Sequence, residues 1–473
     1  MLSILELPSD ILSQVFVKLD GCSLLQCRQV CHVFADTISE DGTLQYYIAL
    51  YTSGLVDDPS SLASIPTIER RQRLQKLLDA RSAWADSGPA SVIELPHSGP
   101  TRTLYWEYSS GLLATLPTVR SFRHTDLLSP TPAPSTEVDI PLDGIDTGTF
   151  FTEHRIDRYQ DLLIVGVLKT NSFMNEDAAL YIFSLSTGKP HPDAAKPFIE
   201  LEEYGGNFAC PHFEIYGDLI LSSENIDGTC WGSAPIVYNW KTGEVVTHIE
   251  NGPDLGLTFL GSDHLIGCAC NHADSTIELP IYSLKTSKCV LTLQLPQMVD
   301  DALSDLESDP LLDHRRISLP PPSQRQKPFY TSPHGTIISL IIRHKQTWGF
   351  ACVFPQSDIL QLVKTHELNS NGEVPVLEWG SWPQSLFTFP YGVASSCYGS
   401  RLAIATLKAN TIQVFDFHPR WFARAMTTVQ YDEIFKEPFK TVLPPQPSQE
   451  MSLPMTPDYG SIILDEGGLI MVS

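Results

Sequence analysis

Basic residues are scarce in this chain: 31 lysines and arginines stand against 55 aspartates and glutamates, for a formal charge of −24 over 473 residues. Nucleic acids and anionic membranes are bound through basic surfaces, so we expect neither as a partner. No apolar run reaches the roughly 18 residues that suggest a spanning helix. Residues 1–10 have neither the basic start nor the apolar stretch of a secretory signal.

The ten cysteines include no C-x-x-C pair and several lie in apolar strings. This usage is typical of reduced, buried thiols, so we expect a cytoplasmic or nuclear protein without a disulfide framework. Cys268, Cys270 and His272 would share one face of a strand. A zinc site needs about four ligands, and no second cluster completes this one. We therefore expect structural cysteines and no metal.

Motifs of catalysis and nucleotide binding are also missing. The chain has no G-x-S-x-G elbow, no G-x-G-x-x-G and no phosphate loop. Its histidines are isolated, and paired carboxylates such as Glu202-Glu203 and Asp300-Asp301 suit a solvated surface better than acid–base chemistry. We expect a protein without a cofactor and without catalytic activity.

The first fifty residues, in contrast, have a strong helical pattern. Ile11, Leu12, Val15, Phe16 and Leu19 recur at helical spacing and predict one apolar stripe. Ser9 is a plausible N-cap of this helix, and the pair 20–21 is expected to end it. Ser23 is expected to cap a second helix, which apolar residues between 24 and 38 continue.

A further helix is predicted over residues 68–84, where leucines and a tryptophan share one side. It carries a dense cluster of arginine and lysine in an otherwise acidic chain. A solvated helix face and a site for a specific acidic partner both fit this cluster, and the solvated face is favoured. Prolines bracket the helix, so we interpret it as a spacer between two domains.

From about residue 90 the pattern changes to short strands separated by turns. A repeat is present: residues 182–189, 237–244 and 281–288 each join an alternating strand to a Thr-Gly or Thr-Ser turn, and 414–417 is a weaker copy. Apolar strands precede them. These strands start at 162, 219, 265, 337, 402 and 469. Several of the intervals between starts exceed the roughly 40–50 residues of a four-stranded propeller blade, which implies insertions.

These patterns predict the domain organisation. We expect a small helical domain over residues 1–50, a helical linker over 51–89 and a six- or seven-bladed β-propeller over 90–473. Proline-rich or acidic insertions near 129–141, 297–330 and 437–457 are expected to be exposed loops, because proline cannot donate to a sheet ladder. The C-terminal strand 469–472 could pair beside the strands near residue 92 and close the ring.

The N-terminal segment resembles the F-box family, on the leucine-proline opening and the apolar positions that follow it. Phe34 stands where that family commonly has tryptophan. The resemblance implies binding to a Skp-type adaptor and, through it, to a cullin–RING ubiquitin ligase. Because so small a module buries little surface alone, its remaining apolar surface could be covered by the partner. The residues expected to bind the adaptor are Leu7, Pro8, Ile11, Leu12, Leu19, Leu24, Leu25, Val30 and Cys31. The alternative is that they form only the core of a helical hairpin.

The strand-rich part looks like a degenerate WD-repeat propeller. Phe183, Tyr238, Tyr282 and Phe415 stand where that family usually has tryptophan, and Asp416 alone keeps the acidic residue that follows. No Trp-Asp or Gly-His pair occurs, which puts the standard hydrogen-bond network of that family in doubt. The combination of F-box, linker and divergent propeller looks like fungal F-box proteins.

The function expected from these resemblances is that of a substrate receptor in an SCF-type ubiquitin ligase, with the propeller binding an unknown protein target. Two alternatives stay open: a propeller enzyme or small-ligand binder with a helical appendage, and an F-box scaffold acting outside any ligase. Five tryptophans could form a recognition surface, although core positions are commoner for this residue. They are Trp231, Trp348, Trp379, Trp382 and Trp421.

Overall fold

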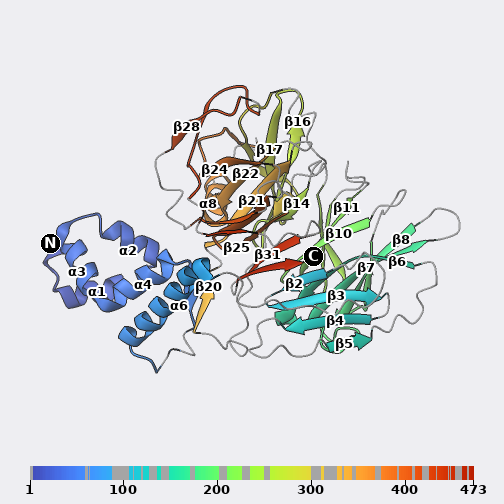
Figure 1. Ribbon diagram of the computed structural model, residues 1–473, viewed down its shortest axis with the longest axis horizontal. Helices are drawn as coiled ribbons and strands as arrows, with labels where there is room; N and C mark the ends of the chain where they lie inside the picture. Colours follow the sequence, from blue (N-terminus) through green and yellow to red (C-terminus); the bar gives the residue numbers. More distant parts are fainter. Residues whose placement is uncertain are drawn as a thin grey trace.

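The computed structural model of the chain shows helices at the N-terminus followed by a six-bladed β-propeller (Figure 1). It describes residues 4–58, 62, 64–87, 106–109, 111–118, 121–126, 136–139, 149–170, 176–201, 210–225, 235–249, 256–299, 311–313, 328–332, 335–343, 348–367, 374–390, 394–406, 411–417, 426–432, 434–445, 447, 449–452, 461–465 and 468–472.

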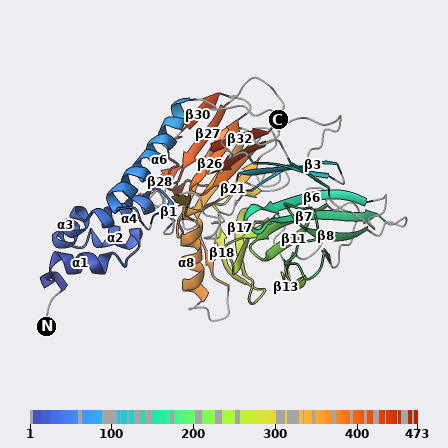
Figure 2. The same ribbon diagram turned by 90° about the horizontal axis from the view of Figure 1, so that it is seen from below.

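The N-terminal helices pack into a small module of their own, at one end of the molecule in Figures 1 and 2. Its centre is apolar: the Phe16 and Phe34 rings meet edge to face with centroids 5.0 Å apart, and buried leucines and isoleucines surround them. Its elements are η1 (Ile4–Glu6), α1 (Ser9–Phe16), α2 (Gly21–Cys27), α3 (His32–Glu40) and α4 (Gly42–Thr52).

The helix boundaries differ from those predicted. Helix α1 begins at Ser9, whose neighbour Pro8 is the N-cap, and no side chain caps it. The pair Asp20-Gly21 begins α2 instead of ending α1: the Asp20 carboxylate accepts a hydrogen bond from the Ser23 backbone N–H at 2.7 Å. An aspartate caps a helix as well as a serine does, so composition alone does not separate these candidates.

Six sheets form the propeller; three are built from strands consecutive in the sequence, and the last three take in a later strand or skip one. The first strands of neighbouring sheets, such as β2, β6 and β10, pack against each other. The blades are β2 (Trp106–Ser109), β3 (Leu112–Thr118), β4 (Ser121–Asp126), β5 (Thr136–Asp139); β6 (Thr149–Asp157), β7 (Leu162–Thr170), β8 (Glu176–Ser184), β9 (Phe198–Glu200); β10 (Cys210–Tyr216), β11 (Leu219–Asn225), β12 (Ile236–Asn239), β13 (Glu244–His248); β14 (Leu257–Phe259), β15 (His264–Gly267), β16 (Ala269–Asn271), β17 (Thr276–Ser283), β18 (Cys289–Gln294), β23 (Val376–Leu377); β19 (Leu311–Asp313), β21 (Ile337–Arg343), β22 (Trp348–Pro355), β24 (Ser385–Pro390); and β25 (Ala394–Tyr398), β26 (Arg401–Thr406), β27 (Thr411–Asp416), β30 (Gln449–Ser452).

A shared backbone hydrogen bond explains the sequence repeat. In the second to sixth blades, the two paired middle strands share one further hydrogen bond. The residue just after the later strand donates its N–H to the carbonyl of the residue just before the earlier strand, and the side chain of the donor residue is buried. The turn at the end of each of the three full copies needs positive φ: Gly188, Gly243 and Ser287 have φ of 67°, 72° and 60°. The donor–acceptor pairs are Leu185–Asp161, Trp240–Asp218, Leu284–Asp263, Gln356–Thr336 and Phe417–Ser400, at 2.7–3.0 Å.

The strand starts predicted at 162, 219, 265, 337 and 402 lie in β7, β11, β15, β21 and β26, and with β2–β5 they give six blades. The start predicted at 469 belongs to β32 (Gly468–Val472). This strand pairs with β31 (Ser461–Asp465) in a two-stranded hairpin that packs beside β25 (Figure 1). Residues near 92, the predicted pairing partner, lie outside the described residues.

Parts of the predicted insertions form strands instead of loops. Strands β5 and β30 fall within 129–141 and 437–457, and each is the last strand of its sheet, an edge position compatible with nearby proline. Within 297–330, β19 is the first strand of the fifth blade. Two short strands, β28 (Thr427–Val429) and β29 (Phe439–Thr441), pair as a separate ribbon. Helix α8 (Gln356–Glu367) joins β22 to β23.

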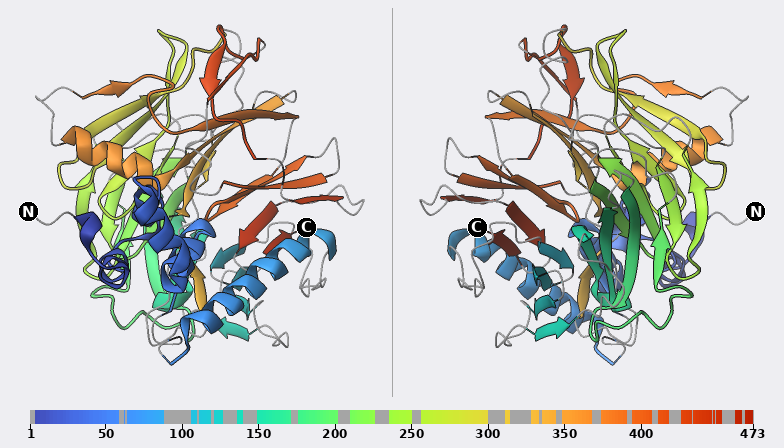
Figure 3. Two further views of the ribbon diagram at one scale, coloured as in Figure 1. Left: turned by 90° about the vertical axis from the view of Figure 1, so that its left-hand side faces the viewer. Right: turned by 90° about the vertical axis from the view of Figure 1, so that its right-hand side faces the viewer.

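The helical module is attached to the propeller by paired strands. Strand β1 (Leu55–Asp57) follows α4 and pairs antiparallel with β20 (Phe329–Thr331), which lies between β19 and β21 in sequence. Helix α6 (Thr67–Ser87) packs on α4 beside this joint, as Figures 2 and 3 show. The joint's apolar core consists of Tyr46, Leu50, Leu55, Leu62, Leu74 and Phe329.

Candidate protein-docking site

The helical module divides its apolar residues between a closed core and an open surface. Leu12 and Leu24, both predicted to bind an adaptor, lie in the core with exposed fractions of 1% and 0%. Leu7, Leu19, Leu25 and Cys31 are half-buried and pack against that core from outside. Of the predicted residues, Pro8, Ile11 and Val30 are the exposed ones.

The exposed apolar surface includes residues that the sequence analysis did not assign to the site. Val15 is 44% exposed and lies four residues after Ile11, so both occupy the same outer face of α1. Ile4 and Leu5 of η1 are about half exposed, and Val30 after α2 is 69% exposed. Helical spacing could have linked Val15 to Ile11, but exposure had to come from the structure.

The surroundings of this surface are acidic. Residues 4–49 contain six carboxylates and two basic side chains. Exposed apolar side chains within a charged rim are typical of protein-docking surfaces. Such a surface can bind a partner by removing apolar area from water.

The joint fixes this surface relative to the propeller. The Tyr46 hydroxyl donates to the Asp57 carboxylate at 3.1 Å, and Arg70 of α6 lies 3.7 Å from the same carboxylate. Burial, together with the negative charge of Asp57, raises the pKa of the Tyr46 hydroxyl, which therefore stays protonated. The backbone of Asp58 donates to Pro328, and that of Ser332 donates to Gly54. The ladder and the apolar core thus hold the two parts together, while the ion pair ties α6 to β1.

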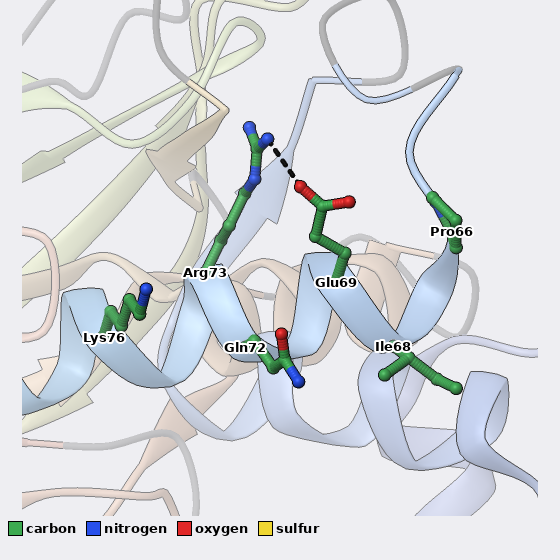
Figure 4. A pocket seen from close by; sticks show the side chains of 6 residues that line it. All are labelled: Pro66, Ile68, Glu69, Gln72, Arg73 and Lys76. Atoms are coloured by element: carbon green, nitrogen blue, oxygen red, sulfur yellow. Dashed lines mark hydrogen bonds and ion pairs between the residues drawn. The ribbon is translucent and has the colours of Figure 1, made fainter.

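The basic cluster predicted on α6 borders a shallow hollow of about 580 Å³, lined by Pro66, Ile68, Glu69, Gln72, Arg73 and Lys76 (Figure 4). Arg73 pairs with Glu69 at 2.8 Å. Arg71 and Lys76 are exposed and form no ion pair within the described residues. Arg70 is half-buried and pairs with Asp57, whereas Arg71, Arg73 and Lys76 are exposed, so the solvated face favoured from the sequence describes three of these four residues.

Near the propeller axis, charged residues from successive blades converge. Arg155 of β6 bridges Glu107 of β2 at 3.0 Å and also pairs with Glu153. Glu214 of β10 accepts from the Thr258 hydroxyl at 2.7 Å. These carboxylates are bonded to the protein itself, so the convergence favours a structural link between blades over a ligand site. No group of three or more histidine, cysteine or acidic residues in the described part of the chain could hold a metal.

The remaining predicted residues are dispersed. Cys268 is buried and burial raises the pKa of its thiol, Cys270 is half-buried and His272 is exposed. Trp382 is buried and Trp379 is half-buried. Trp348 belongs to β22, while Trp231 and Trp421 lie outside the described residues. Among the described helices, none is long and apolar enough to cross a membrane.

The comparison with protein families identifies the helical module. Residues 4–49 match the F-box-like family, so the F-box prediction is confirmed for this segment. No curated protein matches the chain.

Solved structures show partial likeness at low identity. The chain is similar to Kuenenia stuttgartiensis hydrazine synthase (11% identity, 82% of this chain, 98% of that chain, TM-score 0.41) and to a chain of the mitotic checkpoint complex (9%, 81%, 95%, 0.39). It is also similar to BamB from Moraxella catarrhalis (10%, 63%, 68%, 0.29). No argument about function rests on likenesses of this size.

Proposed function

We propose that this chain, with its F-box-like segment and six-bladed propeller, is a non-catalytic substrate receptor of an SCF-type cullin–RING ubiquitin ligase. The observation that carries the proposal is the F-box-like module whose Ile11, Val15 and Val30 are exposed to solvent. A Skp-type adaptor would cover these side chains and connect the chain to a cullin. The compartment we propose is the cytoplasm or the nucleus.

The proposed mechanism is proximity. The propeller holds a protein target while the module holds the ligase, so the target meets the charged ubiquitin donor at a raised effective concentration. The joint of β1 and β20 contributes because a fixed geometry keeps the two binding surfaces at one separation. Within this proposal, residues 51–89 act as a spacer that β1 ties to the propeller, and the propeller alone selects the target.

Co-expression with a Skp-type adaptor tests the proposal. The wild-type chain is expected to recover both the adaptor and a cullin. The variant Ile11→Ser/Val15→Ser/Val30→Ser should lose both, because serine removes apolar area and leaves the buried core intact. Val246→Ser, an equally exposed valine on β13, is the matched control and should recover both.

Two outcomes would contradict parts of this proposal. Equal recovery of the adaptor by the triple variant would refute the assigned surface. Recovery of the adaptor without a cullin would favour the scaffold that acts outside a ligase.

A further inference from the structure

A second apolar surface lies on the propeller. Among its described residues, five large apolar side chains are more than a third exposed. One of them, Val246 on β13, is separate in sequence from the other four. The other four lie in two segments, 374–379 and 426–443, that meet where the Trp379 indole N–H donates to the Lys440 carbonyl at 2.7 Å. They are Val374, Val376, Met426 and Leu443.

Between these segments lies a hollow of about 480 Å³, here called the Trp379 hollow. Trp379, Met426 and Phe439 give it an apolar lining, and Pro296 and Pro438 add to it. Among the lining residues that the structure describes, Glu437 and Lys440 are the charged ones. The β28–β29 ribbon beside it stands at the edge of the propeller, away from α1–α3 (Figures 1 and 3).

The Trp379 side chain is held rigidly. Its ring meets Trp382 and Phe439 edge to face, with centroids 5.3 and 5.6 Å apart. Trp382 and Phe439 belong to the largest buried core of the propeller. A half-exposed tryptophan that is already fixed loses little conformational entropy on binding, and tryptophan is enriched among residues that dominate interfaces.

Two strand edges border the hollow. Strand β23 is the last strand of its sheet and pairs only with β18 among the described strands, and β28 pairs only with β29. An unpaired edge offers backbone N–H and C=O groups to a further strand. Edges beside an apolar hollow favour an extended peptide, which hydrogen-bonds through its backbone and inserts alternate side chains.

Charge narrows the choice of partner. One lysine and one glutamate balance each other in the lining, so the complementary surface is apolar and nearly uncharged. A second copy of this chain would bring another −24 of formal charge, and like net charges oppose association. We propose that the Trp379 hollow binds an extended, low-charge segment with alternating apolar side chains from a partner protein. Naming that partner as the ubiquitination target rests on the proposed function above.

Fluorescence anisotropy with a labelled, capped octapeptide of alternating leucine and serine tests the hollow, using the purified full chain without an adaptor. Saturable binding is expected, and it should persist at high salt because the contacts are apolar. Met426→Glu and Trp379→Ala should each weaken binding by about tenfold or more. Val246→Ser should bind like wild type. A peptide with glutamate in place of leucine should not bind.

Several results would overturn the proposal: no saturable binding to the wild type, equal binding by the folded Met426→Glu variant, or self-association of the wild type that this substitution abolishes. Met426 is 38% exposed, so its substitution leaves the core intact. The Met426→Glu variant therefore still tests the hollow if Trp379→Ala fails to fold. Adaptor recovery, measured on the same samples, separates the two hypotheses. Peptide binding without adaptor binding would contradict only the proposed ligase function. Adaptor binding without peptide binding would contradict only the proposal that the Trp379 hollow binds a peptide.

Discussion

The helical module and the propeller treat apolar residues differently. Of the eleven large apolar side chains that the described chain exposes, five lie in residues 4–30, and the whole propeller contributes another five. The propeller closes its sheets around several cores, so most of the large apolar residues described there are buried within the chain. A module of four short helices cannot do so. The exposed apolar surface of the module therefore indicates a binding partner, whereas most apolar residues of the propeller indicate only how it folds.

The largest effect that separates the two regions is expected from Leu24→Ala. Leu24 is fully buried in the small core of the module, and such truncations cost about 2–5 kcal/mol. Hydrogen exchange of the full chain should show lost protection in α1–α4 and unchanged protection in the propeller. The matched change Ile281→Ala, in the large propeller core, should leave the helices protected. Loss of protection in both regions after Leu24→Ala would contradict the independence of the module's core.

In the propeller, stability is expected to change between pH 7 and pH 4. Burial, followed by the positive charge of Arg155, lowers the pKa of His154 to about 4, and its ring meets Phe122 edge to face. The unfolded chain takes up this proton near pH 6.5 and the folded chain does not. The contribution of His154 to the free energy of unfolding is therefore fully present above pH 6.5, and the free energy of unfolding falls by about 3 kcal/mol as the pH drops towards 4.

Denaturant unfolding between pH 7 and pH 4 measures this effect, and His154→Leu should show a smaller loss over the same range. An unchanged pH dependence in the variant would remove His154 as its source.

A steric test concerns how tightly the module is built. A Cβ added to Gly21 would lie 2.2 Å from the Tyr51 Cβ, so Gly21→Ala forces α2 and α4 apart. Overpacking of this kind costs about 1–3 kcal/mol. Gly42→Ala at the start of α4 is the control, because a Cβ there meets nothing within 4 Å. Equal stabilities of the two variants in thermal unfolding would show that α2 and α4 are not closely packed.

The smallest effect is expected at a helix cap. Asp20→Ala removes the hydrogen bond to the Ser23 N–H and should cost about 1 kcal/mol. Ser9→Ala should be nearly neutral, because no side chain caps α1. Exchange rates of the first-turn amides of each helix distinguish the two, and a larger effect at Ser9 would reverse the cap assignment.

The regular parts of the fold were predictable because they depend on local patterns. The strand-and-turn repeat located the middle strands of the blades, since each copy forms the same backbone hydrogen bond. The pairing of β1 with β20 was not predictable. Its strands have three residues each, and they meet across most of the chain length without a local signal. The blade count remained open for a similar reason: the strand at 469 has the composition of a blade strand and belongs to a hairpin.

The site was predictable as a segment and less so residue by residue. Ile11 and Leu12 are adjacent, both apolar and both at helical spacing, yet one is 42% exposed and the other 1%. Only the packing of α1 on the other helices separates surface from core. The Trp379 hollow shows the same limit, because residues from three separate segments, 296–297, 379–380 and 426–440, assemble it.

Calorimetric titration of the purified chain with a Skp-type adaptor tests the central claim most directly. We predict tight binding with a negative heat-capacity change, since the contact buries apolar area, and its loss in Ile11→Ser/Val15→Ser/Val30→Ser but not in Val246→Ser. Undiminished binding of the triple variant, or no binding by the wild type, would contradict the claim that the open face of the F-box-like module docks a ligase adaptor.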